Sequence, residues 1–152
     1  MNEISVRRAR PGDLDALLEL YGELVQEQAA AAAEERDAVA LVLERILAEP
    51  TRHLLVAELQ GRVIGTLDVV IVANLTHHGM PWAIIENVVV AAEARRSGAG
   101  RALFGRVLEI AEEAGCYKVQ LLSGKHRLQA HTFYRSVGLD ALAEGFKVYL
   151  DG

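Results

Sequence analysis

The spacing of hydrophobic positions changes along the chain, and each spacing predicts a type of element. Apolar residues three and four positions apart predict two helices, from Leu14 to Val25 and from Val39 to Leu47. Asp13 is placed to cap the first helix, and Pro50 stops the second. The run Ala29–Ala33 has no periodicity, so it either continues the first helix or forms a connection.

Segments rich in β-branched residues and leucine predict strands. The predicted strands cover residues 4–7, 54–59, 63–72, 82–90, 118–122 and 146–150. Gln60-Gly61 separates the second and third strands and predicts a tight hairpin. The segment Trp82–Val90 is apolar on both faces, which places it in the middle of a covered sheet.

The second half of the chain alternates between strand and helix. One helix is predicted from the apolar positions between Leu103 and Ala114 and ends at Gly115, and another runs to Gly138. A strand, a helix and a strand across residues 83–122 require a crossover, and hence a parallel strand pair. We therefore expect one α/β domain over residues 1–152, a mixed central sheet with helices on both faces.

Composition narrows the function classes. The chain has 152 residues, 16 basic and 21 acidic, and a formal net charge of -5, which argues against a non-specific nucleic-acid binder. Its single cysteine, Cys116, excludes a disulfide framework and a cysteine-rich zinc site, so no metal is expected. No apolar run reaches the ~20 residues of a membrane span, and the N-terminus lacks a signal-peptide pattern. A cytoplasmic protein is the expectation.

A glycine-rich segment between a strand and a helix is the candidate anion site. Gly98 and Gly100 allow the backbone to approach a ligand, and Arg95, Arg96 and Arg101 add local positive charge. A solvated glycine-rich turn is the structural alternative. No Gly-Lys-Ser/Thr follows, which excludes a P-loop. A dinucleotide-binding fingerprint needs a third small residue at position 103, and Leu103 stands there, which argues against a dinucleotide-binding loop.

Arg95-x-x-Gly98-x-Gly100 resembles the Q/R-x-x-G-x-G/A loop of the GNAT superfamily of N-acetyltransferases. The segments Ile85–Val90, Gly115–Val119 and Phe133–Leu139 resemble that family's fourth strand, its fifth strand and the helix that follows. The order of elements fits as well, so the resemblance covers essentially the whole chain.

The resemblance implies acetyl-coenzyme A bound where the fourth and fifth strands splay apart. It implies that the pantetheine arm pairs with Val88 and Val90. It also implies that the pyrophosphate binds the loop, here Arg96, Ser97, Gly98, Ala99, Gly100 and Arg101, with Arg95 opening the motif.

Acetyl transfer to an amine requires a neutral amine, a donor for the oxyanion and a proton for the departing thiolate. The resemblance places the hydroxyl of Tyr134 near the coenzyme sulfur, as the acid; the alternative is a core tyrosine. Glu86, a carboxylate in an apolar strand, is the candidate base, and its partial burial would raise its pKa; the alternative is an ion pair. A backbone N–H at Asn87 or Val88, freed by a bulge, is the expected oxyanion donor.

Other polar residues are weaker candidates. His77 and His78 are adjacent, so in extended chain they cannot chelate one ion together; they line an acceptor pocket or face solvent. His131 is a reserve acid or base one turn from Tyr134. Cys116 is expected to be a small buried hydrophobe.

Two positions depart from related patterns. Arg127 replaces an Asn that family members often carry seven residues before the tyrosine. The segments Ile85-Glu86 and Gly115–Lys118 are similar to glucosamine-6-phosphate acetyltransferases, but Asn87 replaces that group's Asp.

The expected activity is acetyl transfer from acetyl-coenzyme A to a primary amine of a small molecule, by direct attack. Acetylation of a protein amine and a non-catalytic acyl-coenzyme A sensor of the same fold remain alternatives, as does a purely structural protein that binds no coenzyme. A homodimer is suggested by family habit, with Trp82 and the strand Val63–Leu75 as contact surface.

Overall fold

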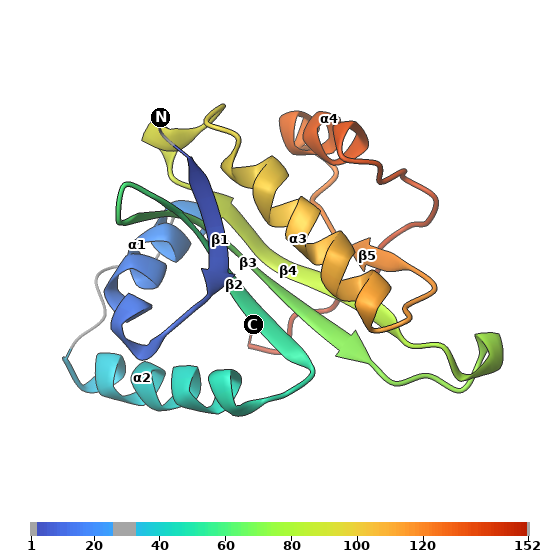
Figure 1. Cartoon of the computed structure of the whole chain (residues 1–152), viewed down its shortest axis with the longest axis horizontal. Helices are drawn as coiled ribbons and strands as arrows, with labels where there is room; N and C mark the ends of the chain where they lie inside the picture. Colours follow the sequence, from blue (N-terminus) through green and yellow to red (C-terminus); the bar gives the residue numbers. More distant parts are fainter. Residues whose placement is uncertain (1–2, 26–32, 152) are drawn as a thin grey trace.

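The computed structural model describes residues 3–25 and 33–151, and within these residues it has one five-stranded sheet and four α-helices (Figure 1). The strands are β1 (Ile4–Arg8), β2 (Arg52–Leu59), β3 (Arg62–Val72), β4 (Trp82–Val90) and β5 (Val119–Leu121). The helices are α1 (Leu14–Leu24), α2 (Ala33–Ala48), α3 (Ala99–Glu113) and α4 (Leu128–Ser136). The chain is therefore a mixed α/β protein, as the hydrophobic pattern predicts.

The strands follow one another in chain order, β1-β2-β3-β4-β5. The first three pairs are antiparallel, and β4 and β5 are parallel because α3 forms the crossover between them. The β4–β5 pairing covers only Ala83–Ile85 against Val119–Leu121. From Glu86 onward no strand of the described residues pairs with the β5 side of β4, so the predicted splay is confirmed.

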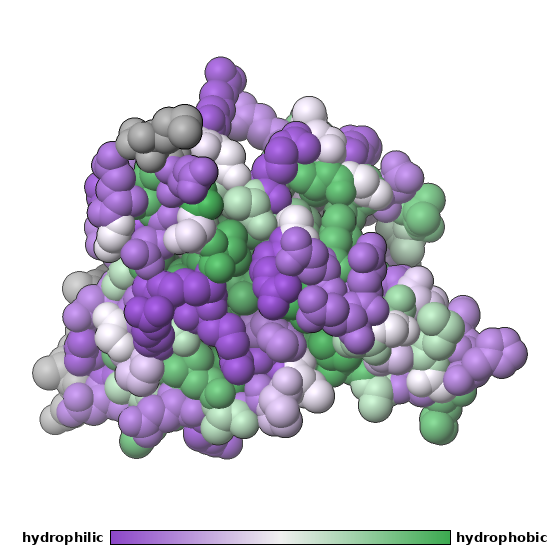
Figure 2. Space-filling model, viewed as in Figure 1, coloured by the Kyte–Doolittle hydropathy of each residue, from purple (hydrophilic) through white to green (hydrophobic). Residues whose placement is uncertain are grey.

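Helices cover both faces of the sheet because alternate residues of β2 point to opposite sides. Leu54 and Val56 pack in one cluster with residues of α1 and α2. Leu55 and Ala57 belong to the larger core cluster, which includes Leu103 and its neighbours on α3. The face seen in Figure 2 is mostly hydrophilic, with hydrophobic residues visible in scattered patches.

Glycines end two helices where the sequence predicts it. The φ of Gly115 is +75°, and the N–H of Cys116 donates to the carbonyl of Ala111, which closes the end of α3. The φ of Gly138 is +101° just after α4.

Two predictions of local structure are wrong. Residues 146–150 form no strand and pair with no strand of the described residues, since a strand needs a partner edge as well as an alternating pattern. Asp13 does not cap α1 with its side chain. Its carboxylate instead accepts hydrogen bonds from Arg7 and from the N–H of Arg10, and the bond from Arg7 lowers the pKa of Asp13. The run Ala29–Ala33 lies almost wholly outside the described residues.

The expected dimer surface at Trp82 and strand Val63–Leu75 stays a prediction, and the structure limits which part of the strand a partner can reach. β3 lies in the middle of the sheet with β2 on one side and β4 on the other, and Ile64 to Val69 are buried. A central strand has no free edge to offer a partner.

A buried ion pair supports β3 beside the splay. The carboxylate of Asp68, 3% exposed, accepts from the guanidinium of Arg52 at 2.5 and 2.9 Å. Asp68 also lies opposite Glu86 in the β3–β4 register. This pair therefore links β2 to β3, the strand that pairs with the one carrying the candidate base.

Replacing Arg52 with methionine should lower the free energy of unfolding, because it leaves the Asp68 carboxylate buried without its cation. We expect a loss of about 2–3 kcal/mol in urea denaturation, less than for a fully buried pair because Arg52 retains contact with water. The matched control is Arg62→Met, which breaks the exposed Arg62–Glu93 pair and should cost less than ~1 kcal/mol. Equal losses in the two variants would contradict this role for Asp68.

Candidate active site

A cavity of about 140 Å³ lies where β4 and β5 separate. Its lining residues come from α1, β4, the end of β5 and α4: Leu24, Ile85, Glu86, Asn87, Val88, Leu121, Leu122, Arg127 and Tyr134. The structure therefore brings together Glu86, Val88 and Tyr134, which the sequence proposes as base, coenzyme contact and acid. Val90 lies further along the same strand, outside this cavity.

The backbone of β4 bulges at the cavity wall. Thr66 pairs with Val89 and Asp68 with Glu86, so Asn87 and Val88 together face the single residue Leu67. The φ of Asn87 is +53°, a left-handed conformation that asparagine tolerates better than most residues. The bulge lies where the sequence analysis places the oxyanion donor, and it turns the local N–H groups out of the regular ladder.

Tyr134 is held by aromatic packing on α4. Its side chain is 8% exposed, and its ring lies 5.7 Å from Phe104 and 5.9 Å from Phe133 between centroids. Burial raises the pKa of the Tyr134 hydroxyl, while the adjacent Arg127 guanidinium acts in the opposite direction. The tyrosine is thus both a core residue and a cavity residue, so the two interpretations of the sequence are compatible.

Glu86 is exposed, so the expectation of a partly buried carboxylate is wrong. It lies on β4 next to the bulge, where the sheet has already opened and water reaches the side chain. Among the ion pairs of the described residues none involves Glu86. Its carboxylate therefore lines the cavity and forms no ion pair with any of the described residues.

The glycine loop leads into the N-terminus of α3. The φ of Arg96 is +65° and that of Gly98 is +94°, and the Oγ of Ser97 accepts a hydrogen bond from the N–H of Ala99 at 3.3 Å. A helix start offers backbone N–H groups and a positive dipole end to an anion. The side chain of Ala99 is buried in the core, so Ala99 offers only its backbone.

The arginines of this loop face a different hollow from the splay cavity. Arg95, Arg96 and Ser97 border a depression of about 380 Å³ together with the β2–β3 turn. Arg101 reaches α4, where its Nη2 lies 3.4 Å from the Oγ of Ser136. The loop and the splay cavity are thus neighbouring parts of the molecule rather than one continuous pocket.

Gly100 has a packing role that the sequence does not reveal. A Cβ atom at this position would lie 2.9 Å from Cζ of Phe133. The ring of Phe133 in turn stands edge-on to Phe104 at 5.5 Å. The absence of a side chain at Gly100 lets α3 and α4 approach each other, which positions the neighbouring Tyr134.

Arg127 is the site residue that the sequence reasoning undervalued. It appears there only as a departure from a family pattern, yet in the structure it lines the cavity with Tyr134. Arg127 is the N-cap residue of α4, and its position seven residues before Tyr134 is the signal in the sequence that links the two. The Nε2 of His131 donates to the carbonyl of Gly124 at 2.8 Å, so this histidine fixes the loop before Arg127.

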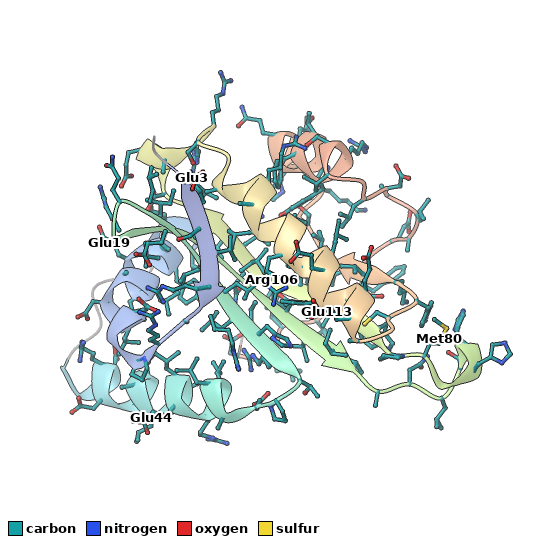
Figure 3. The ribbon with its side chains drawn as sticks, in the orientation of Figure 1. Glu3, Glu19, Glu44, Met80, Arg106 and Glu113 are labelled. Atoms are coloured by element: carbon teal, nitrogen blue, oxygen red, sulfur yellow. The ribbon has the colours of Figure 1, made fainter. Side chains whose placement is uncertain are left out.

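The other candidates lie elsewhere. His77 and His78 occupy a turn with φ of +53° and +60° rather than extended chain, and the His77 ring stacks on Tyr117 at 3.8 Å. Met80 of the same loop lies far from α4 (Figure 3). Cys116 is half-buried, and burial raises the pKa of its thiol. The described residues contain no group of three or more potential metal ligands and no helix able to cross a membrane.

The fold, with its splayed β4–β5 pair, is that of a family of acetyltransferases. The family model "Acetyltransferase (GNAT) family" matches residues 14–139, and the chain belongs to that family.

Particular proteins are similar to this chain over nearly its whole length. The chain is 30% identical to a glucosamine 6-phosphate N-acetyltransferase of Trypanosoma brucei brucei, over 91% of this chain and 90% of the relative. A putative acetyltransferase from Agrobacterium tumefaciens has a similar structure, with TM-score 0.89 and 39% identity over 95% of this chain and 99% of that one. A structure titled as a transcriptional regulator from Bacillus halodurans gives TM-score 0.90 and 28% identity, covering 97% and 100%.

Proposed function

We propose that this chain transfers the acetyl group of acetyl-coenzyme A to a primary amine of a small molecule by direct attack. The observation that carries the proposal is the convergence of Glu86, the β4 bulge and Tyr134 on one cavity. Few arrangements supply a carboxylate, a displaced N–H and a hydroxyl donor within one splayed strand pair.

The coenzyme would follow β4 and end at the start of α3. The side of β4 that lacks a strand partner offers Val88 and Val90 to the amides of the pantetheine arm. The pyrophosphate would accept from backbone N–H groups at residues 96–101, with the arginines adding charge. The residues present fit this ligand, because Gly98 takes a left-handed conformation at a helix start, where backbone N–H groups point outward.

Each chemical requirement then has a residue. Glu86 removes a proton from the attacking amine, directly or through water, and the amine nitrogen bonds to the thioester carbonyl carbon. An N–H at Asn87 or Val88 donates to the oxyanion. As the carbon–sulfur bond breaks, its electron pair stays on sulfur and Tyr134 donates a proton to the thiolate.

Direct attack is favoured over an acyl-enzyme. Cys116, the only cysteine of the chain, does not line the cavity, and burial raises the pKa of its thiol. A buried thiol of raised pKa is a poor nucleophile.

Release of free coenzyme A thiol across a panel of amines tests the proposal. Amino sugars and their phosphates come first, because a relative of 30% identity is named for glucosamine 6-phosphate; polyamines and a lysine peptide follow. Amine-dependent thiol release is the expected result. Coenzyme binding in a thermal shift without turnover on any amine would favour a sensor and overturn the enzyme.

Arg127→Gln should lower kcat by about 10- to 100-fold, because a hydrogen bond to a charged group contributes ~1.5–3 kcal/mol. In the transfer step the guanidinium beside Tyr134 stabilises the negative charge that the hydroxyl acquires. Arg135→Gln, on the exposed surface of the same helix, is the matched control and should keep wild-type kcat. If both variants turn over at the wild-type rate, Arg127 has no part in transfer.

A further inference from the structure

The sheet face that carries Glu86 has an apolar patch outside both hydrophobic cores. Its four side chains are Val70, Val72, Trp82 and Ile84, from the paired parts of β3 and β4. Residues two apart on a strand share a face, as do directly paired residues, so all four stand on the Glu86 side of the sheet. All four are partly exposed, and neither hydrophobic cluster of the described residues includes them. We call these four side chains the apolar shelf; α3 covers the opposite face (Figure 1).

The shelf begins at the candidate base. Glu86, Ile84 and Trp82 alternate along β4, so their side chains follow one another at intervals of about 7 Å. Glu86 also lines the splay cavity, so the shelf adjoins the proposed reaction centre. A ligand lying along the shelf would therefore have one end at the Glu86 carboxylate and its body over Ile84.

The long sides of the shelf carry no net charge. Arg52, beside Val70 in the register, forms an ion pair with Asp68. Gln120, beside Ile84 on β5, is uncharged. The alkyl side chains between them offer no hydrogen bond, so hydroxyl groups directed at the shelf would lose their water without a replacement. The middle of the shelf therefore favours an apolar ligand.

The two ends of the shelf differ in charge. At the inner end the Glu86 carboxylate forms no ion pair with any of the described residues. At the outer end the ammonium of Lys118 lies 5.6 Å from the centre of the Trp82 ring. A ligand amine is attracted to the inner end, whereas a second positive charge at the outer end would be repelled by Lys118.

We propose that the acceptor is a primary amine with an uncharged apolar body, which lies on the shelf while its nitrogen is at Glu86. The inference rests on the proposed function, because it assigns the acceptor of that same reaction. The nitrogen bonds to the thioester carbonyl carbon and loses a proton to Glu86. The electron pair of the carbon–sulfur bond leaves with sulfur, which takes a proton from Tyr134 to give coenzyme A. Contact of the body with Ile84 and Val70 removes apolar surface from water, so each added methylene should strengthen binding.

Alkylamines of increasing length test the inference, with release of coenzyme A thiol as the readout. From ethylamine to hexylamine, kcat/KM should rise by about two- to fourfold for each methylene that the shelf partly buries. Hexamethylenediamine, with the same carbon chain and a second positive charge, should be at least about tenfold poorer than hexylamine. Glucosamine should also be poorer than hexylamine, because its hydroxyl groups would lie against the shelf.

Substitutions on the shelf should change the preference for long amines. Ile84→Thr keeps the β-branched shape and adds a hydroxyl, and it should lower kcat/KM about tenfold more for hexylamine than for ethylamine. Val70→Thr, on the neighbouring strand, should shift this ratio in the same direction and serves if Ile84→Thr does not fold. Leu41→Thr is the matched control, because Leu41 is 62% exposed on α2, and it should leave the ratio unchanged.

The possible failures of this inference and of the proposed function are distinguishable. Turnover on other amines without a rise along the alkylamine series would overturn the inference and leave the proposed function standing. Absence of thiol release with every amine would overturn both. A flat series with a light-scattering mass of twice the 16.5 kDa of one chain would assign the shelf to a second copy and overturn the inference.

Discussion

Tyr134→Phe should lower kcat by ~10²–10⁴-fold, the usual contribution of one positioned proton donor. The substitution keeps the ring and its contacts with Phe104 and Phe133, and removes only the hydroxyl. The melting temperature and the affinity for acetyl-coenzyme A should therefore change little. Steady-state kinetics should show the loss in kcat with KM nearly constant, which marks an interaction made in the transition state.

The pH dependence supplies a second criterion for Tyr134. The hydroxyl acts as an acid only while protonated, and burial raises its pKa above the ordinary tyrosine value of about 10. Ionisation of Tyr134 should therefore cause no loss of kcat between about pH 7 and about pH 9. A Tyr134→Phe rate within about tenfold of wild type would show that water supplies the proton to the thiolate, a good leaving group, and would remove Tyr134 as the acid.

Gly100→Val should weaken acetyl-coenzyme A binding by more than tenfold and lower stability as well. The first added carbon lies 2.9 Å from the Phe133 ring, so α4 must move away from α3 or the ring must turn. Either response disturbs both the backbone N–H groups at the start of α3 and the aromatic packing of Tyr134. Calorimetric titration with acetyl-coenzyme A gives the affinity, and thermal melting gives the stability.

Gly105→Val is the matched control for that experiment. Gly105 lies on the same helix, and a Cβ there would meet no heavy atom within 4 Å. Its affinity should match wild type. Arg101→Ala should weaken binding less than Gly100→Val, since the backbone rather than this side chain holds the pyrophosphate. Wild-type affinity in Gly100→Val would count against the whole coenzyme site.

Strong periodicity made most of the fold predictable. Trp82–Val90 is apolar except at Glu86 and Asn87, and its bounds in the structure match the prediction. Gly115 ends α3 in a conformation of positive φ. Glycine adopts that conformation most easily, so the residue type alone predicts where the helix ends. The parallel β4–β5 pair follows from the need for a crossover.

What the sequence could not supply depends on contacts between distant residues. The carboxylate of Asp13 accepts a hydrogen bond from Arg7 of β1 and does not form the predicted helix cap. The exposure of Glu86 depends on where β5 stops, and the need for glycine at position 100 depends on a ring at position 133. The alternation at 146–150 is genuine, but a strand forms only where another strand edge pairs with it, and the sequence does not show whether one does.

Amide chemical shifts of the ¹⁵N-labelled chain during titration with acetyl-coenzyme A test the central claim most directly, because they locate the ligand without requiring the acceptor. The account predicts the largest shifts at residues 87–90 along the open side of β4 and at residues 96–101 at the start of α3, with smaller shifts around Tyr134. Absence of shifts in both segments, or shifts confined to other elements such as α2 and β1, would contradict it.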